Sequence, residues 1–307
     1  MSVPLVIVGA TASGKSALAM EVARRAGDVE LVSVDSMQVY RGMDIGTAKP
    51  TPAERAEVRH HLVDVAEPSE EFSVAEFQGL VRTALADIES RGRRAVLVGG
   101  TGLYVRSIVD GLTIPGQWPD VRRELEAEPD TAALHRRLSV LDPTAAARME
   151  PANRRRVVRA LEVTIGSGRA FSTFGPGLEA YPDVGFHLVG VRVERDERNE
   201  RIAARFHRMV DAGLLEEVRA LAALRPPPSR TARQALGYRE LLRHVEDGAP
   251  LDACVDEAIT RTRQFARRQE VWFRRDPRIT WVDGAGQIGA VAAEVLGDWD
   301  DRCRTTP

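Results

Sequence analysis

Short apolar runs alternate with helically periodic segments along the first hundred residues of the chain. The runs lie at residues 5–8, 31–34, 61–65 and 95–98, and apolar positions recur every three or four residues between them. Parallel strands need long crossover connections, which are usually helices, so this alternation is typical of a parallel sheet. We therefore predict an α/β fold in which helices flank a parallel sheet.

The middle of the chain has a different pattern. Between residues 111 and 186 the apolar runs disappear, and short helical patterns are separated by prolines. Apolar runs return at 186–193 and 279–282, whereas the rest of the C-terminal half is helical with a break at residues 226–228. We predict a core formed by residues 1–110 and 187–307, interrupted by a helical insertion domain at 111–186.

Composition narrows the class of protein. The 307 residues are 43% hydrophobic and 29% charged, which is ordinary for a globular protein. No stretch approaches the roughly 18 apolar residues of a membrane span, and residues 1–10 lack a basic leader, so we expect a cytoplasmic protein. Cys254 and Cys303 have no zinc-site spacing, which argues against a structural zinc and a disulfide framework.

The formal net charge of −2 conceals a local segregation of charge. Arginines crowd two stretches, residues 154–159 and 261–275, with few acidic residues between them. Each cluster is consistent either with a solvated helix face or with a surface that binds phosphates. Charge alone leaves both interpretations open.

The first apolar run leads directly into a GxxxxGK[ST] pattern, which an amphipathic segment follows. Glycines let backbone N–H groups converge on phosphate oxygens, the helix N-terminus adds positive potential, and Lys15 supplies a full charge. Ser16 is the expected ligand of a magnesium ion, Mg2+. The predicted phosphate-binding loop, or P-loop, consists of Gly9, Ala10, Thr11, Ala12, Ser13, Gly14, Lys15 and Ser16.

A P-loop predicts a bound phosphate but not a reaction. Most P-loop enzymes hydrolyse or transfer a terminal phosphate and carry an acid after a later strand, but here the run at 95–98 ends in Gly-Gly-Thr-Gly. The first acid after an apolar run is Asp35, on a strand that we expect beside the P-loop strand. Asp35 is either a group that faces the ligand or a turn carboxylate. His60 and His61, adjacent on a strand, point to opposite faces and do not predict a metal site.

Several longer motifs occur in a characteristic order. They are GATASGKS at 9–16, DSMQVYRGMDIGTAKP at 35–50, HHLVD at 60–64, GGTGLY at 99–104, RALEV at 159–163, RFHRM at 205–209, QALGYRE at 234–240 and TRQFARRQEVWFR at 262–274. With these motifs the chain resembles the tRNA dimethylallyltransferases, also called tRNA isopentenyltransferases, over most of its length. It departs from the family at Ala10, where proline is common, and at Val271, where threonine is common.

The resemblance implies an alkyl transfer rather than a phosphoryl transfer. The P-loop would hold the pyrophosphate of dimethylallyl diphosphate, and the allylic carbon would pass to N6 of the tRNA adenosine immediately 3′ of the anticodon. Asp35 would be the general base, with Thr101 positioning the reacting groups and Arg205 helping Lys15 and Mg2+ to neutralise the leaving diphosphate. Ser36, Met37 and Gln38 would lie beside Asp35 at the adenine pocket.

The resemblance also implies where the tRNA anticodon stem-loop binds. The insertion domain would close on it, and a bacterial-type enzyme without the zinc-finger extension of eukaryotic relatives is expected. We expect a monomer. The remaining residues on the family's tRNA-contacting segments are Arg122, Arg155, Arg156, Val157, Val158, Arg159, Gln234, Ala235, Leu236, Gly237, Tyr238 and Arg239.

Three alternatives remain open from the sequence. An ATP-dependent kinase of a small metabolite would use Asp35 to hold the acceptor hydroxyl and would require a nucleotide. An adenylate isopentenyltransferase would keep the chemistry but act on free AMP, ADP or ATP, which the arginine-rich segments disfavour. A non-catalytic RNA-binding module would use the P-loop only as a switch.

Overall fold

The computed structural model describes residues 3–175, 177 and 180–305. It divides into two compact units, which we call the sheet unit (residues 1–109 and 183–307) and the helical unit (residues 110–182). Among the described residues, no helix is both long enough and apolar enough to cross a membrane.

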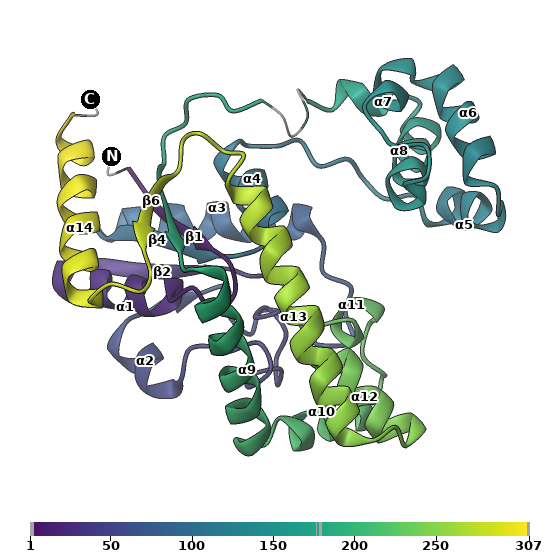
Figure 1. Ribbon diagram of the computed structural model, residues 1–307. Coiled ribbons are helices and arrows are strands. Elements are labelled where there is room, and N and C mark those ends of the chain that lie inside the picture. Colours follow the sequence, from purple (N-terminus) through teal and green to yellow (C-terminus); the bar gives the residue numbers. More distant parts are fainter. Residues whose placement is uncertain (1–2, 176, 178–179, 306–307) are drawn as a thin grey trace. The chain divides into compact units, whose positions relative to one another are not determined.

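The sheet unit is built on six strands, and every neighbouring pair runs parallel. This confirms the predicted α/β class. The order across the sheet is β3-β2-β4-β1-β5-β6, so the P-loop strand β1 is central (Figure 1). The strands span β1 Leu5–Gly9, β2 Val29–Val34, β3 His60–His61, β4 Arg94–Gly99, β5 His187–Arg192 and β6 Thr280–Asp283.

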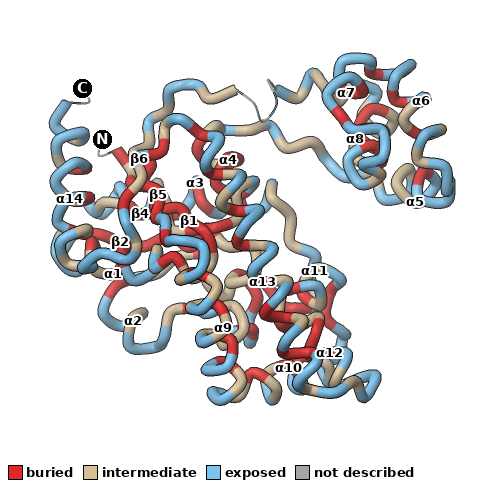
Figure 2. Tube along the Cα trace, viewed as in Figure 1, coloured by how far each residue is buried: buried red, intermediate tan, exposed pale blue. Residues whose placement is uncertain are grey.

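Alternating side chains of the strands pack against helices on both faces of the sheet. On β1, Leu5 and Ile7 join one buried cluster with the side-by-side helices α1 and α14, whereas Val6 and Val8 join a second cluster on the opposite face. Figure 2 shows these central strands as buried. The helices of the sheet unit span α1 Lys15–Ala26, α2 Pro52–Glu57, α3 Val74–Ser90, α4 Gly102–Val109, α9 Arg195–Asp211, α10 Leu214–Ala223, α11 Arg230–Arg233, α12 Tyr238–Asp247, α13 Leu251–Phe273 and α14 Ile288–Thr305.

Two expectations about the sheet are wrong. β4 lies between β1 and β2, so the strand that precedes Asp35 is not the neighbour of the P-loop strand. The run at 61–65 supplies only the end of β3, because Leu62 (φ 62°) and Asp64 (φ 59°) adopt left-handed conformations that no strand can contain. Beyond β3 the chain is held instead by a bridge between Tyr40 and Ala66.

The helical unit contains no strand among its described residues and has its own apolar core. Leu125, Leu134, Leu138 and Leu161 are at most 3% exposed and form the centre of this core. Asp142 is buried beside it and accepts hydrogen bonds from the backbone of Ala145 and from Ser172. The helices are α5 Pro119–Ala127, α6 Thr131–Leu141, α7 Pro143–Ala147 and α8 Arg154–Ser167, followed by the 3₁₀ turn η1 Phe171–Thr173.

Candidate active site

The P-loop connects β1 to α1, and the first backbone N–H groups of α1 have no hydrogen-bond partner within the helix. Ala12 (φ 63°) and Gly14 (φ 93°) are left-handed, and no side chain caps the N-terminus of α1. Gly9 has no space for a side chain, because a Cβ there would lie 2.7 Å from Ser13 Oγ and from the carbonyl oxygen of Val191. The first N–H groups of α1 are thus available to an anion, and Lys15 begins the helix beside them.

Three charged side chains surround the P-loop. Burial lowers the pKa of Lys15 to about 8, the positive charge of Arg205 lowers it as well, and Asp35 opposes both effects. Burial also lowers the pKa of Arg205, and Asp35 again acts in the opposite direction. Nη2 of Arg205 donates to Oγ1 of Thr11 at 2.7 Å, which ties α9 to the P-loop. The structure therefore gathers two cations and one carboxylate around a site that suits a polyanion.

Asp35 follows β2 and makes one turn contact. Its Oδ1 accepts the N–H of Met37 at 2.8 Å, so the turn-carboxylate interpretation describes part of its role. A carboxylate has acceptor capacity for about four hydrogen bonds, so this contact leaves it able to accept a proton. Next to Asp35, Ser36 Oγ lies 3.5 Å from Oγ1 of Thr101, which follows β4. The carboxyl ends of β1, β2 and β4 thus bring the P-loop, Asp35 and Thr101 together, as doubly wound sheets generally do with ligand-binding groups.

The Gln38 amide is occupied by protein groups. Its Nε2 donates to the carbonyl oxygens of Thr47 and Ala48, both at 3.1 Å, and its Oε1 accepts from Ser33 Oγ at 2.7 Å. These contacts hold the turn after β2 against the following loop. Gln38 therefore holds its neighbours in position, and its oxygen, which can accept a second hydrogen bond, keeps contact with an adenine as a prediction.

The loop at residues 43–49, which lies within the motif at 35–50, is anchored from both sides. On one side Lys49, 8% exposed, donates to the Tyr40 carbonyl oxygen and to the carboxylates of Asp44 and Asp64. These contacts explain why a lysine in this motif is structural rather than a ligand of phosphate.

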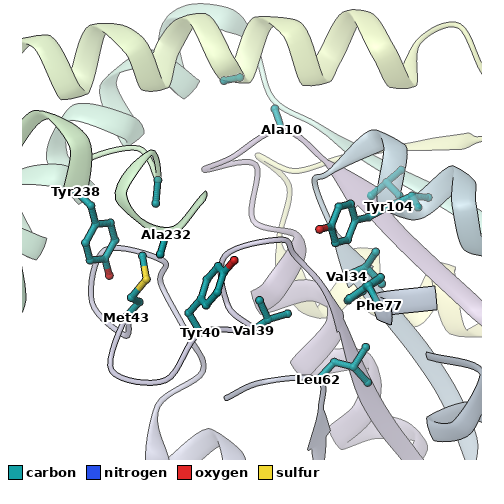
Figure 3. Close-up of a cluster of buried hydrophobic side chains, with 14 of the residues drawn as sticks. Ala10, Val34, Val39, Tyr40, Met43, Leu62, Phe77, Tyr104, Ala232 and Tyr238 are labelled. Atoms are coloured by element: carbon teal, nitrogen blue, oxygen red, sulfur yellow. The ribbon is translucent and has the colours of Figure 1, made fainter. Parts of the chain in front are cut away.

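The other anchor comes from helices α10 and α12. Glu217 accepts the N–H groups of Asp44 and Ile45 at 2.8 Å and that of Gly46 at 3.1 Å, and it also accepts the Tyr238 hydroxyl. Tyr238 is fully buried beside Met43 (Figure 3), and its ring leaves no space for a Cβ at Gly46. Sequence reasoning missed Glu217, and the only signal for such an anchor was a long motif with no phosphate-binding role of its own.

Sequence reasoning also missed Gln269 on α13. Its Oε1 accepts the N–H of Thr11 at 2.9 Å and its Nε2 donates to the carbonyl oxygen of Gly100 at 2.8 Å. A signal was present in the sequence, because Gln269 occupies the buried stripe of α13 together with Thr262, Ala266 and Phe273. A long polar side chain on such a stripe requires polar partners.

The helical unit divides its predicted tRNA-contacting residues into three groups. Arg155 and Arg156 are exposed at the start of α8. Arg159 and Arg122 lie 2.9 Å and 3.6 Å from carboxylate oxygens of Glu162, which is 1% exposed. Val157 and Val158 are buried in the core of the unit and support α8, and their part in binding RNA stays a prediction.

The predicted segment at residues 234–239 is divided in the same way. Gln234 is exposed, whereas Ala235, Gly237 and Tyr238 are buried, and Arg239 pairs with the buried Glu240 at 2.9 Å. The buried side chains of Ala235 and Tyr238 support this segment from inside, and the contact of the segment with RNA stays a prediction. Leu236 is partly exposed. A surface pocket of about 570 Å³ adjoins this segment and is lined by Arg230, Arg233, Gln234, Arg239, Leu242, Arg243, Glu246 and Asp247.

A metal site made only of protein side chains is not found in the described part of the chain, where no three His, Cys, Asp or Glu residues cluster suitably. Ser16 is exposed in the first turn of α1. This arrangement fits a magnesium ion that takes one hydroxyl from the loop and most of its remaining ligands from bound phosphates and water.

A parallel sheet whose central strand leads into this loop, with the cations Lys15 and Arg205 at the site, defines a protein of the P-loop class whose site suits a phosphate-bearing ligand. The family can be named more closely. The family model described as "IPP transferase" matches residues 38–276, and the chain belongs to that family.

Individual relatives agree with this assignment. The chain is 49% identical over 283 residues to the tRNA dimethylallyltransferase of Pseudarthrobacter chlorophenolicus, covering 91% of this chain and 93% of the relative. It is 45% identical over 299 residues to that of Geobacter metallireducens, covering 95% and 96%. The crystal structure of the tRNA isopentenylpyrophosphate transferase from Bacillus halodurans matches with a TM-score of 0.72 and 38% identity, covering 99% of this chain and 97% of the other.

Proposed function

We propose that this protein transfers a dimethylallyl group from dimethylallyl diphosphate to N6 of the tRNA adenosine immediately 3′ of the anticodon, releasing diphosphate. The observation that carries the proposal is the meeting of a cationic P-loop and a carboxylate, Asp35, in a member of the IPP transferase family. The names of its relatives support the same donor and acceptor. A donor phosphate clamp and a base together are what this reaction needs.

The residues around the P-loop divide the chemistry into two tasks. Lys15, Arg205 and the N-terminus of α1 stabilise the diphosphate as the allylic C–O bond breaks, because negative charge develops on the leaving oxygen. Magnesium, held through Ser16 and the phosphates, would add positive charge to the same leaving group. Asp35 takes the N6 proton as the new C–N bond forms, and Thr101 positions the reacting groups beside it.

The acceptor side of the proposal rests on exposed cations. The lone pair of N6 is delocalised into the adenine ring, so attack needs a carboxylate close enough to take the proton. The adenine must therefore leave the base stack of the RNA and enter a pocket beside Asp35. Two surfaces support contact with RNA phosphates. In the helical unit Arg155 and Arg156 are exposed, and in the sheet unit Gln234 is exposed beside a pocket that arginines line. Free nucleotides would need none of these groups.

A comparison of donors and acceptors tests the proposal. Purified protein is incubated with dimethylallyl diphosphate or ATP as donor, and with unmodified tRNA, AMP or a small alcohol as acceptor. We expect prenylated tRNA only with dimethylallyl diphosphate and tRNA, at the adenosine 3′ of the anticodon. Prenylated AMP without prenylated tRNA would establish the free-nucleotide reaction instead, and phosphoryl transfer from ATP would establish a kinase.

A further inference from the structure

Gln269 joins two loops that belong to different strands. Gln269 is 7% exposed, and its side-chain amide spans from the Thr11 backbone N–H, in the P-loop after β1, to the Gly100 carbonyl oxygen, in the loop after β4. The contact is close, because a Cβ at position 100 would lie 2.5 Å from Gln269 Nε2, so only glycine fits at Gly100. Gln269 therefore sets the separation of the two loops through one accepted and one donated hydrogen bond.

Each loop carries a group of the proposed reaction. Thr11, whose N–H binds Gln269, accepts the Arg205 guanidinium through its hydroxyl, so its position determines where that cation stands at the diphosphate. Gly100 precedes Thr101, whose hydroxyl lies 3.5 Å from that of Ser36 beside Asp35. One side chain thus touches the backbone of the donor site and that of the acceptor site.

We propose that Gln269 is a positioning residue that holds the diphosphate-binding loop and the acceptor-binding loop in the register required for prenyl transfer. This inference rests on the proposed function. A neutral amide suits the role because only one end of the side chain meets a donor and only the other end meets an acceptor. A carboxylate of the same shape would keep the bond to Thr11 but place a negative oxygen against the Gly100 carbonyl.

That chemistry supplies a test with a pH signature. In Gln269→Glu the protonated carboxyl donates to Gly100 and restores both bonds, whereas the ionised carboxyl repels the same carbonyl oxygen. Burial raises the pKa of the introduced carboxyl. On the P-loop side the charged groups of the site are Arg205, which donates to the Thr11 hydroxyl, and Lys15 and Asp35, which interact electrostatically with each other and with Arg205. On α13 itself the neighbouring Glu270 is paired with Arg198 at 2.7 Å.

The measured quantity is the ratio of variant to parent kcat at each pH between about 5 and about 9, with saturating tRNA and donor. We expect the variant to be about 10- to 100-fold slower at high pH, the cost of one disrupted buried contact, and to approach the parent as pH falls. Using the ratio removes the pH dependence that both proteins share. The matched control is Gln287→Glu, an identical change at an exposed site, for which the ratio should stay near one throughout.

A second pair of variants keeps the test independent of how well Gln269→Glu folds. Gln269→Ala and Gly100→Ala disrupt the same contact from opposite sides, so their effects on kcat should not add when combined. Additive losses, a pH-independent ratio for Gln269→Glu, or an unaffected kcat in variants that melt like the parent would each overturn the positioning role. Absence of prenyl transfer by the parent protein would instead refute the proposed function.

Discussion

Replacing Asp35 by asparagine separates its two roles, that of a turn group and that of a base. Asparagine has nearly the same shape as aspartate, and its amide oxygen can still accept the N–H of Met37, so Asp35→Asn preserves the turn after β2. The amide cannot accept the proton that leaves N6. A positioned general base contributes about 10²–10⁴ in rate, or about 3–5 kcal/mol, and we expect kcat to fall by that amount.

Electrostatics set the conditions of the assay. Asp35 raises the pKa of Lys15, so its neutralisation lowers that pKa from about 8. At a pH of about 6.5 the lysine keeps its charge in the parent and stays largely charged in the variant, and the KM for the donor should change little. At a pH of about 8 the loss of the carboxylate would mix a binding defect with the chemical one.

Single-turnover rates with enzyme in excess, measured at the lower pH beside a melting curve, distinguish the two roles. Asp283→Asn is the matched control, because Asp283 Oδ1 accepts the N–H of Ala285 at 2.9 Å in the same turn geometry at the end of β6. If Asp35 only held its turn, both variants would melt close to the parent, because asparagine keeps the turn contact, and both would keep their rate. Transfer by Asp35→Asn within threefold of the parent would refute the general-base argument.

Three further predictions concern the P-loop, the RNA surface and the anchored loop. Because the pKa of Lys15 is lowered to about 8 in the free protein, the Kd for the donor should rise as pH increases through about 8, by at most about tenfold per pH unit. Calorimetry should show that Lys15→Ala binds the donor weakly and without that pH dependence. Binding of tRNA should weaken with salt, and charge reversal at Arg155 and Arg156 should reduce the slope of log K against log salt by about 1.4 if each contacts one phosphate; an unchanged slope would place both in solvent. Glu217→Gln should lower the free energy of unfolding in urea by about 2–4 kcal/mol, because the NH2 of the new amide would face backbone N–H groups that donate to the carboxylate in the parent. The same change at the exposed Glu216 should lower the free energy of unfolding little.

Much of the fold follows from patterns that the sequence makes visible. Apolar runs locate β1, β2 and β4 because their side chains are buried on both faces. The order of the strands could not be predicted, because no local property of the β4 sequence indicates that β4 inserts between β1 and β2. The run at 61–65 misled for a related reason, because only Leu62 of its apolar residues is buried and the backbone there is left-handed rather than extended.

The candidate site was predictable where residues act through a motif and not where they act through another residue. Lys15, Asp35 and Arg205 belong to short motifs, and the structure brings them together. Glu217 binds backbone groups that are distant in the sequence, and such a pairing leaves no local trace. Gln269 leaves only the trace of a polar residue on a buried helix stripe, which does not identify its distant partners. The buried valines of α8 show the converse, because a helix that contacts a partner contains core positions as well as surface ones.

The hydrogen bond between Thr11 and Gln269 joins residues 258 positions apart, which affects when the P-loop can reach its final structure during synthesis. A ribosome delivers the P-loop first, but β1 gains its neighbour β5 only after the whole helical unit has been synthesised. The last bond that sets the P-loop must wait for α13. A nascent chain therefore exposes an unfinished anion-binding loop during most of its synthesis. The helical unit, which has a core of its own, is free to fold before the sheet of the other unit is complete.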